Sequence, residues 1–145
     1  MKRIFFIWLL LFASANVTLA QVCDGSAVKV IRASSSPKFD RLVFEFYGDT
    51  VPPIESLAYA KPPFIGPSGE PEKVTGKFFV EAFWHTPMDT CSVGKKQFNL
   101  PILRSVKVYD LFEGDIRYII SLKKKATFTT TKLTNPGRLV LDFAK

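Results

Sequence analysis

The sequence predicts an all-β domain, an antiparallel β-sandwich of about eight or nine short strands. The chain ends in an alternating apolar stretch, 138–143, which opens directly from the turn signal Asn135-Pro136-Gly137. The stretch 41–46 repeats the same Arg-Leu-Val opening and the same alternation. Turn residues recur at short, regular spacing, and no segment after residue 20 shows a convincing helical period, which is typical of sandwiches and barrels.

The predicted strands follow one another closely along the chain. In order they are 27–33, 41–47, 56–60, 73–75, 78–84, 105–111, 115–123, 126–133 and 138–143. In the first strand, Val28, Val30 and Arg32 are expected on one face, because strand side chains alternate. In the second, the alternate apolar residues from Leu42 to Phe46 are expected in the core.

The middle of the chain contains the proline-rich part of the sequence. Two prolines in 51–54 remove hydrogen-bond donors, so this piece is expected at a sheet edge. A long turn is predicted over 62–71, and 73–75 and 78–84 are expected to be strands joined at Gly76. Strand 78–84 is apolar on both sides, with Phe79 and Phe83 opposite Val80 and Trp84, which predicts that both of its faces are covered.

The second half of the chain is expected to complete the sheets. Residues 85–96 are predicted to be irregular, and 105–111 and 115–123 to form a hairpin whose inner face carries Tyr118, Ile120 and Leu122. The threonines of 126–133 favour a pleated strand because they are β-branched.

The first twenty residues are predicted to be a signal peptide outside the fold. Lys2 and Arg3 precede an apolar run, 4–12, which is too short to span a bilayer comfortably, and Ala20 is a suitable cleavage residue. An uncleaved N-terminal anchor is the alternative. We therefore expect an exported protein, periplasmic or extracellular, with 21–38 as an N-terminal strand and loop, 39–145 as the main domain, and no further transmembrane segment.

The chain has two cysteines, Cys23 and Cys91, and an even pair in an exported protein predicts one disulfide. Closing a loop of 68 residues could contribute about 4 kcal/mol in the chain-entropy model. Two cysteines and one histidine make a poor zinc set, so no metal site and no cofactor is expected.

Charge indicates the chemistry of a partner. Removing Lys2 and Arg3 lowers the formal net charge from +7 to +5, which favours anionic surfaces such as wall polymers, acidic glycans or lipid headgroups. The alternative is that this charge serves solubility alone. A nucleic-acid partner is disfavoured by export.

Three stretches together resemble a known family. They are 39–48, 69–80, and 110–118 continuing through Phe128 and Pro136 to 138–142. In this order they look like the AMIN-like domain, a secreted bacterial β-domain similar to the AMIN domains that accompany cell-wall amidases and secretins. The resemblance covers 39–145. It implies a β-sandwich that binds or localises at the cell envelope through cell-wall polymer, peptidoglycan in particular, or an envelope protein, and it implies no catalytic centre.

The candidate binding residues combine lysines with aromatic side chains. Lys123, Lys124 and Lys125, with Arg117 and Lys132 nearby, are expected to form a basic patch beside Tyr118. The alternative is a solvated turn that protects a sheet edge. The aromatic side chains considered for a sugar contact are Trp84, Tyr47 and Tyr59.

Four charges occupy equivalent places on two strands. Asp40, Arg41, Arg138 and Asp142 are expected to be structural, in cross-strand pairs that contribute about 0.2–1 kcal/mol each. The alternative is an anion or glycan contact by an arginine fork.

Three other functions remain open from the sequence. A small-ligand carrier would need a sizeable apolar cavity inside a barrel. A hydrolase would use His85, the only histidine, with Asp89 as the acid and Ser92 as a nucleophile. An inhibitor or assembly factor would present an edge strand or loop, for which the proline-rich 51–71 is the candidate region.

Overall fold

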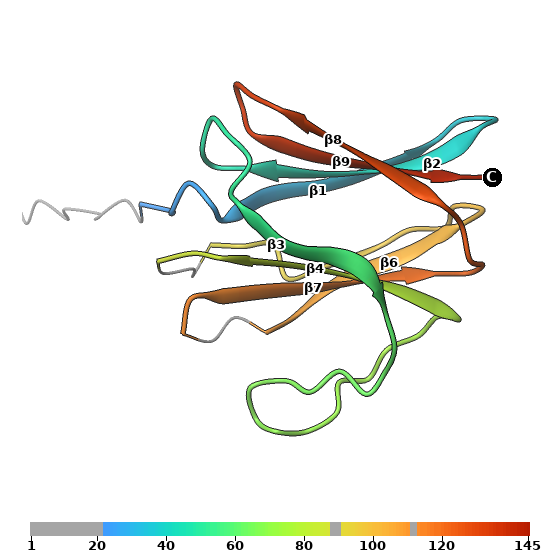
Figure 1. Ribbon diagram of the computed structural model, residues 1–145, viewed down its shortest axis with the longest axis horizontal. Helices are drawn as coiled ribbons and strands as arrows, with labels where there is room; N and C mark the ends of the chain where they lie inside the picture. Colours follow the sequence, from blue (N-terminus) through green and yellow to red (C-terminus); the bar gives the residue numbers. More distant parts are fainter. Residues whose placement is uncertain (1–21, 88–90, 111–112) are drawn as a thin grey trace, which may run out of the picture.

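The computed structural model describes residues 22–87, 91–110 and 113–145, and its strands form two antiparallel sheets packed face to face (Figure 1). The described strands are β1 (Val28–Ser35), β2 (Phe39–Phe46), β3 (Ile54–Ala60), β4 (Phe78–His85), β5 (Lys95–Gln97), β6 (Leu103–Asp110), β7 (Asp115–Leu122), β8 (Phe128–Leu133) and β9 (Arg138–Ala144). The four-stranded sheet has the order β1-β2-β9-β8, and the five-stranded sheet has the order β3-β4-β7-β6-β5. The predicted fold class is confirmed.

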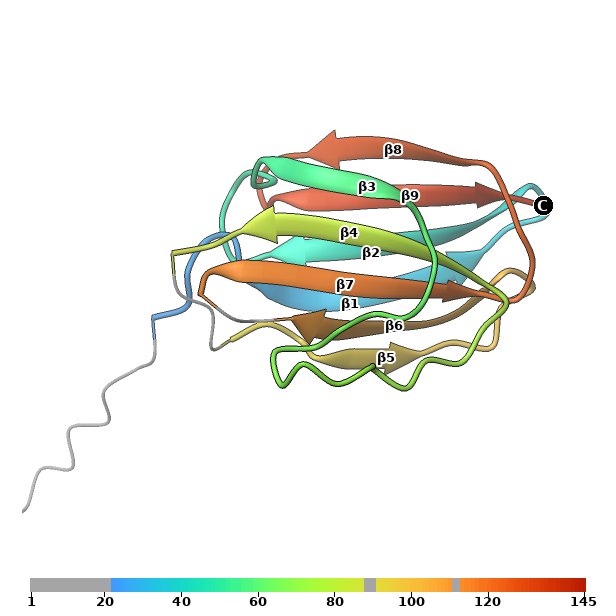
Figure 2. The same ribbon diagram turned by 60° about the horizontal axis from the view of Figure 1, so that its bottom comes forward.

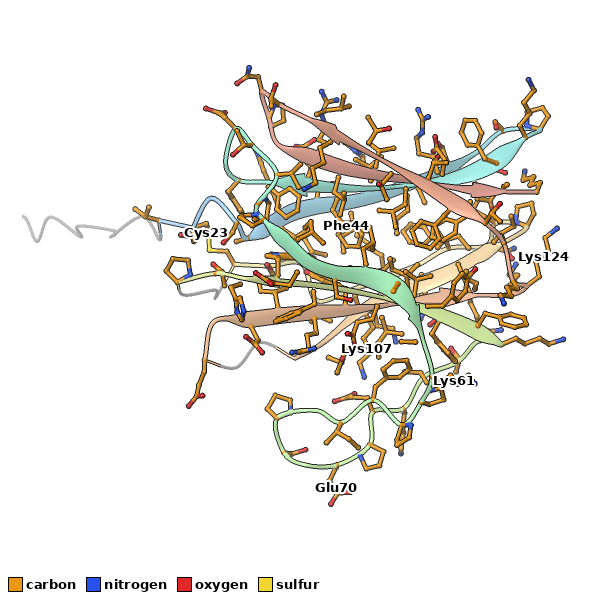
Figure 3. The ribbon with its side chains drawn as sticks, in the orientation of Figure 1. Cys23, Phe44, Lys61, Glu70, Lys107 and Lys124 are labelled. Carbon is orange, nitrogen blue, oxygen red and sulfur yellow. A yellow bond between two sulfur atoms is a disulfide. The ribbon has the colours of Figure 1, made fainter. Side chains whose placement is uncertain are left out.

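The alternation predicted for the two similar strands is confirmed. In β2, Leu42, Phe44 and Phe46 are fully buried, and in β9, Leu141 and Phe143 are too. The two strands pair with each other in the middle of the four-stranded sheet, so their shared opening reflects a shared position beside the core. Phe44 lies between the sheets (Figure 3), where burial of large apolar side chains stabilises the sandwich.

The face predicted for the first strand is wrong. A β-bulge between Val28 and Val30 shifts the register of β1 against β2. Because a bulge adds one residue to one strand, the alternation changes phase, and Ile31 is buried in place of Val30, while Arg32 is exposed.

The stretch 73–75 is not a strand, contrary to the prediction. It belongs to an excursion, 61–77, that lies against the outer face of the five-stranded sheet (Figures 1 and 2). Phe64 from this excursion packs on Phe79 and Tyr109 in a second apolar cluster with Ile119, and Val74 packs against that cluster. The predicted covering of both faces of β4 is confirmed, and the excursion supplies the cover.

Two differences from the predictions concern the edge strands of the five-stranded sheet. The proline-rich piece runs into β3, which starts at Ile54 and is an edge strand as expected. The segment predicted to be irregular contains the start of β5, a short edge strand whose side chains are exposed. Three exposed residues carry no apolar pattern, so their pairing with β6 left no signal in the sequence.

The Asn135-Pro136-Gly137 turn is set by a close approach between backbones. Gly137 donates its N–H to the carbonyl of Gly48, and a Cβ atom at Gly137 would lie 2.3 Å from the carbonyl oxygen of Thr50. Only glycine fits this contact, so the turn fixes where β9 starts relative to the loop after β2.

The disulfide between Cys23 and Cys91 is confirmed. It joins the segment before β1 to the segment before β5. Next to it, Val28 donates its N–H to Ser92 Oγ at 2.9 Å, and Val93 donates its N–H to the carbonyl of Val28 at 3.0 Å. These contacts and the disulfide fasten one end of the sandwich, which we call the disulfide end.

The signal peptide predicted over 1–20 lies outside the described residues. Within the described ranges, no helix is long and apolar enough to cross a membrane.

Candidate binding site

Two of the predicted binding residues lie in the core. The Trp84 and Tyr118 side chains are both fully buried, and their rings stack with centroids 5.5 Å apart. Trp84 Nε1 donates to the carbonyl of Ser26, and the Tyr118 hydroxyl donates to the carbonyl of Val93. Both are on the inward face of their strands and cannot contact a surface ligand, so a binding role for them is wrong. They anchor the disulfide end instead.

Arg117 is near the disulfide end of the outer face of the five-stranded sheet, apart from the three lysines. Its guanidinium lies 3.8 Å from the ring centroid of Phe83, 3.6 Å from a carboxylate oxygen of Glu81, and 3.3 Å from one of Asp115. Burial alone would lower the pKa of Arg117, but the acidic partners outweigh it and raise this pKa. The predicted basic patch is therefore not a single surface.

The predicted catalytic set around His85 is only partly visible. His85 Nδ1 lies 2.8 Å from Asp115 Oδ1, and the imidazole is 59% exposed. Asp89 is outside the described residues, and Ser92 Oγ accepts the N–H of Val28. Among the residues that the structure describes, His85 has no hydroxyl or thiol within hydrogen-bond distance, and both cysteines are in the disulfide.

Most of the charges predicted to be structural lie in cross-strand positions. Arg41 donates to both carboxylate oxygens of Asp142, each at 2.7 Å, from a directly paired register position. Arg138 pairs in register with Glu45 of β2. Asp40 behaves differently because it is fully buried.

Asp40 holds the two sheets together. Its carboxylate accepts the N–H groups of Ile102 and Leu103 at 2.7 and 3.1 Å and the hydroxyl of Ser35 at 2.6 Å, and Lys145 Nζ lies 3.3 Å away. Burial alone would raise the pKa of Asp40, but these hydrogen bonds outweigh it and hold the pKa below its ordinary value. The prediction of a cross-strand pair for Asp40 missed that its side chain points inward.

A hollow of about 550 Å³ opens at the end of the molecule opposite the disulfide, which we call the lysine end. Lys61 follows β3, Lys77 precedes β4, and Lys125 follows β7, so three separate segments contribute lysines to the lining of one hollow. In Figure 3, Lys61 and Lys124 lie at this end and Cys23 at the other. We call the hollow the basic cleft; its lining residues are Tyr59, Ala60, Lys61, Pro62, Gly76, Lys77, Phe78, Phe79 and Lys125.

The walls of the basic cleft are aromatic. Tyr59 and Phe78 are 37% and 36% exposed. The Tyr59 ring is held in place because its hydroxyl donates to the carbonyl of Ala126 and accepts the N–H of the same residue at 3.0 Å. Lys125 Nζ lies 5.7 Å from the Tyr59 ring centroid, within the range of a cation–π contact.

The end of the excursion packs closely on β7 at Gly76, which lines the cleft. A Cβ atom at Gly76 would lie 3.2 Å from Phe79 and from Ser121, and 3.3 Å from the carbonyl oxygen of Leu122. Gly76 therefore lets the end of the excursion approach β7 closely and brings Lys77 beside Phe78.

No carboxylate in the described part of the chain compensates the charges of the basic cleft. Within the described ranges, none of the three lysines forms an ion pair with a carboxylate, and no acidic residue lines the cleft. Lys124 is exposed beside it, and Lys123 Nζ lies 3.1 Å from Asn99 Oδ1. Several like charges around aromatic faces repel one another unless an anion neutralises them, so this arrangement favours an anionic ligand.

Of the cleft residues, sequence reasoning identified Lys125 and Tyr59 and missed Lys61, Lys77 and Phe78. The missed lysines flank the excursion, on either side of its prolines and glycines. A loop that leaves and re-enters neighbouring strands returns its two flanks to the same place, and this is the signal that could have found them.

The comparison with protein families decides the affiliation of the chain. The model of the AMIN-like domain matches residues 26–145. The chain belongs to the AMIN-like domain family. The match takes in β1 as well as the residues on which the resemblance was based. No curated protein and no solved structure matches the chain significantly.

AMIN-like domains are in general non-catalytic binding domains associated with the cell wall or envelope. The geometry of this AMIN-like domain suits binding. Its core between the sheets is filled by packed side chains, and the basic cleft is a surface hollow rather than an interior cavity. Within the described residues, no group of three His, Cys, Asp or Glu side chains could hold a metal ion.

Proposed function

We propose that this protein is an exported domain that binds anionic cell-wall polymer, peptidoglycan in particular, through the basic cleft. The observation that carries the proposal is the convergence of three lysines without carboxylate partners among the described residues on two exposed aromatic rings. Lysine ammonium groups attract carboxylate and phosphate groups, and aromatic faces pack on the apolar faces of sugar rings.

Two further observations support export, into the periplasm or to the outside of the cell. A disulfide such as Cys23–Cys91 forms and persists in oxidising compartments. The AMIN-like family is associated with the envelope. The proposal includes removal of residues 1–20, which the intact mass of the secreted protein would test directly.

The test is a pull-down of the purified, disulfide-intact protein on insoluble peptidoglycan sacculi at low and at moderate salt. In the cleft variant, Lys61, Lys77 and Lys125 are changed to glutamine. In the control variant, Lys95, Lys96 and Lys132 are changed to glutamine, which removes the same charge from exposed positions outside the cleft.

Wild type is expected to bind saturably, and the cleft variant to bind roughly tenfold more weakly, because each exposed ion pair contributes up to about 1 kcal/mol. The control variant is expected to stay within about twofold of wild type. Equal weakening of both variants would mean that net charge, rather than the cleft, drives binding. Absence of wild-type binding would refute the proposal and direct the search to a protein partner.

A further inference from the structure

Two smaller hollows lie next to the basic cleft at the end of the sandwich. The second hollow, of about 300 Å³, is lined by Tyr59, Lys125, Ala126 and Thr127, so it shares Tyr59 and Lys125 with the cleft. The third, of about 310 Å³, shares Thr127 with the second and reaches the outer face of the four-stranded sheet. Each hollow thus shares a lining residue with the next, and the three follow one another along the crossover between β7 and β8, a row that we call the path.

Aromatic rings recur along this path. Tyr59 lines the first hollow and Phe128 the third, and their ring centroids lie 6.1 Å apart. Phe39 is the second ring of the third hollow, and the Arg41 guanidinium lies 5.0 Å from its centroid. Aromatic residues thus line the hollows on both sides of Thr127.

The charge along the path has one sign. Lys38 lines the third hollow and, among the described residues, has no carboxylate partner. The one acid of that lining, Asp142, accepts both hydrogen bonds of the Arg41 guanidinium and is therefore neutralised. Lysines without a described carboxylate partner are therefore present at both ends of the path, and Thr127 and Thr129 also line the third hollow.

We propose that the three hollows form one extended groove for a linear carboxylated polysaccharide, with the basic cleft as its first subsite and the Lys38–Phe39 hollow as its last. This inference rests on the proposed function and specifies its ligand. Carboxylates repeated along a chain match cations at both ends, and sugar rings match the aromatic rings, which a polyanion without rings would not use. A ligand that spans both subsites gains affinity because its second contact is intramolecular.

The test measures binding of galacturonate oligomers by calorimetry at low salt. The probes are a disaccharide, an octasaccharide, the methyl-esterified octasaccharide, which lacks the charges, and a linear polyphosphate, which lacks the rings. Wild type is expected to bind the octasaccharide at least tenfold more tightly than the disaccharide and to bind the esterified form and the polyphosphate more weakly.

Two variants act on the far part of the groove alone. Thr127→Trp fills the passage between the subsites, and Lys38→Gln removes the last cation; both residues are exposed and neither lines the basic cleft. Their controls are Thr131→Trp and Lys132→Gln, exposed positions on β8 outside the path. The two groove variants are expected to lose the advantage of the octasaccharide and to keep the affinity for the disaccharide within about twofold.

The outcomes separate this inference from the proposed function. Equal affinity for the two oligomers, or an octasaccharide affinity unchanged by Thr127→Trp and Lys38→Gln, would overturn the extended groove. Polyphosphate binding as tight as octasaccharide binding would overturn the polysaccharide. If the cleft variant still loses binding to sacculi in those cases, the proposed function stands and only the longer groove fails. If the oligomer experiment fails and the cleft variant also binds sacculi as wild type does, both the extended groove and the proposed function are refuted.

Discussion

The cations at the two ends of the sandwich differ in whether acidic residues surround them. At the disulfide end, Arg117 lies on Phe83 between Glu81 and Asp115, so protein carboxylates neutralise its charge. At the lysine end, Lys61 and Lys77 have no such partners among the described residues. Two acids near that end, Asp40 and Asp142, have other partners. Asp40 accepts three hydrogen bonds and lies beside Lys145, and Asp142 accepts hydrogen bonds from Arg41.

The difference separates charges that stabilise the fold from charges available to a ligand. A cation surrounded by acids and an aromatic ring contributes to folding, and removing it leaves carboxylates without a partner. A cluster of cations without acids contributes little or nothing to folding and repels itself. Stability measurements should therefore show large effects at the disulfide end and small effects in the basic cleft, whereas binding measurements should show the reverse.

The largest expected effect on stability is loss of the disulfide. Replacing Cys23 and Cys91 together by serine should lower the free energy of unfolding by about 3–4 kcal/mol, because the bridge closes a loop of 68 residues. Urea unfolding monitored by the fluorescence of Trp84, which is buried near that end, measures this change. A loss below about 1 kcal/mol would show that hydrogen bonds such as that of Ser92 hold the disulfide end without the bridge.

The next effect concerns Asp40 and depends on pH. Its pKa in the folded protein lies below the ordinary value, so the stability that it contributes is complete above the unfolded pKa and is lost as the pH falls through the folded pKa. Asp40→Asn should lower the free energy of unfolding at pH 7 by about 1–3 kcal/mol. The difference from wild type should shrink as the pH drops below about 4.

Urea titrations of wild type and Asp40→Asn at several pH values measure this dependence. Asp24 serves as a reference, because hydrogen bonds from Ser26 lower its pKa as well, yet it is not fully buried. Asp24→Asn should remove a smaller part of the acid dependence. A difference between wild type and Asp40→Asn that stays constant from pH 7 to the acid range would mean that packing rather than charge accounts for Asp40.

A smaller effect is expected from Arg117, and it tests the comparison most directly. Arg117→Met keeps much of the contact with Phe83 but leaves Glu81 and Asp115 without their cation, so the free energy of unfolding should fall by about 1–2 kcal/mol. The matched change in the cleft, Lys77→Met, should alter it by less than about 0.5 kcal/mol. Thermal unfolding of the two variants, measured under the same conditions, checks this. A larger loss of stability for Lys77→Met than for Arg117→Met would contradict the comparison.

Much of the fold followed from patterns of period two. The strands around Phe44 and Leu141 were predicted because large apolar residues on one face alternate with a face that carries most of the charges, and residue types show this alternation directly. The pairing of Cys23 with Cys91 followed because no other pairing exists. The errors came where a contact outside the strand decided the outcome, as at the bulge of β1 and in the stretch 73–75.

The candidate site was predicted less well, and the reason is the same. Trp84 and Tyr59 are both aromatic residues of strands, and only the packing of two sheets buries the first and leaves the second beside a lysine. Arg117 lies near the start of β7 and Lys125 just after its end, so the length of the strand separates them and leaves Arg117 among acids.

By itself the sequence determined the fold class, the disulfide and the family resemblance, because each depends on residue types and their order along the chain. The tertiary structure alone decided which cations have partners. Lys61, Lys77 and Lys125 belong to three segments separated in sequence, and they meet only because the excursion returns to β4 beside the end of β7. Convergence of that kind is a property of the packed chain, since distances between side chains on different strands are set by sheet pairing rather than by sequence spacing.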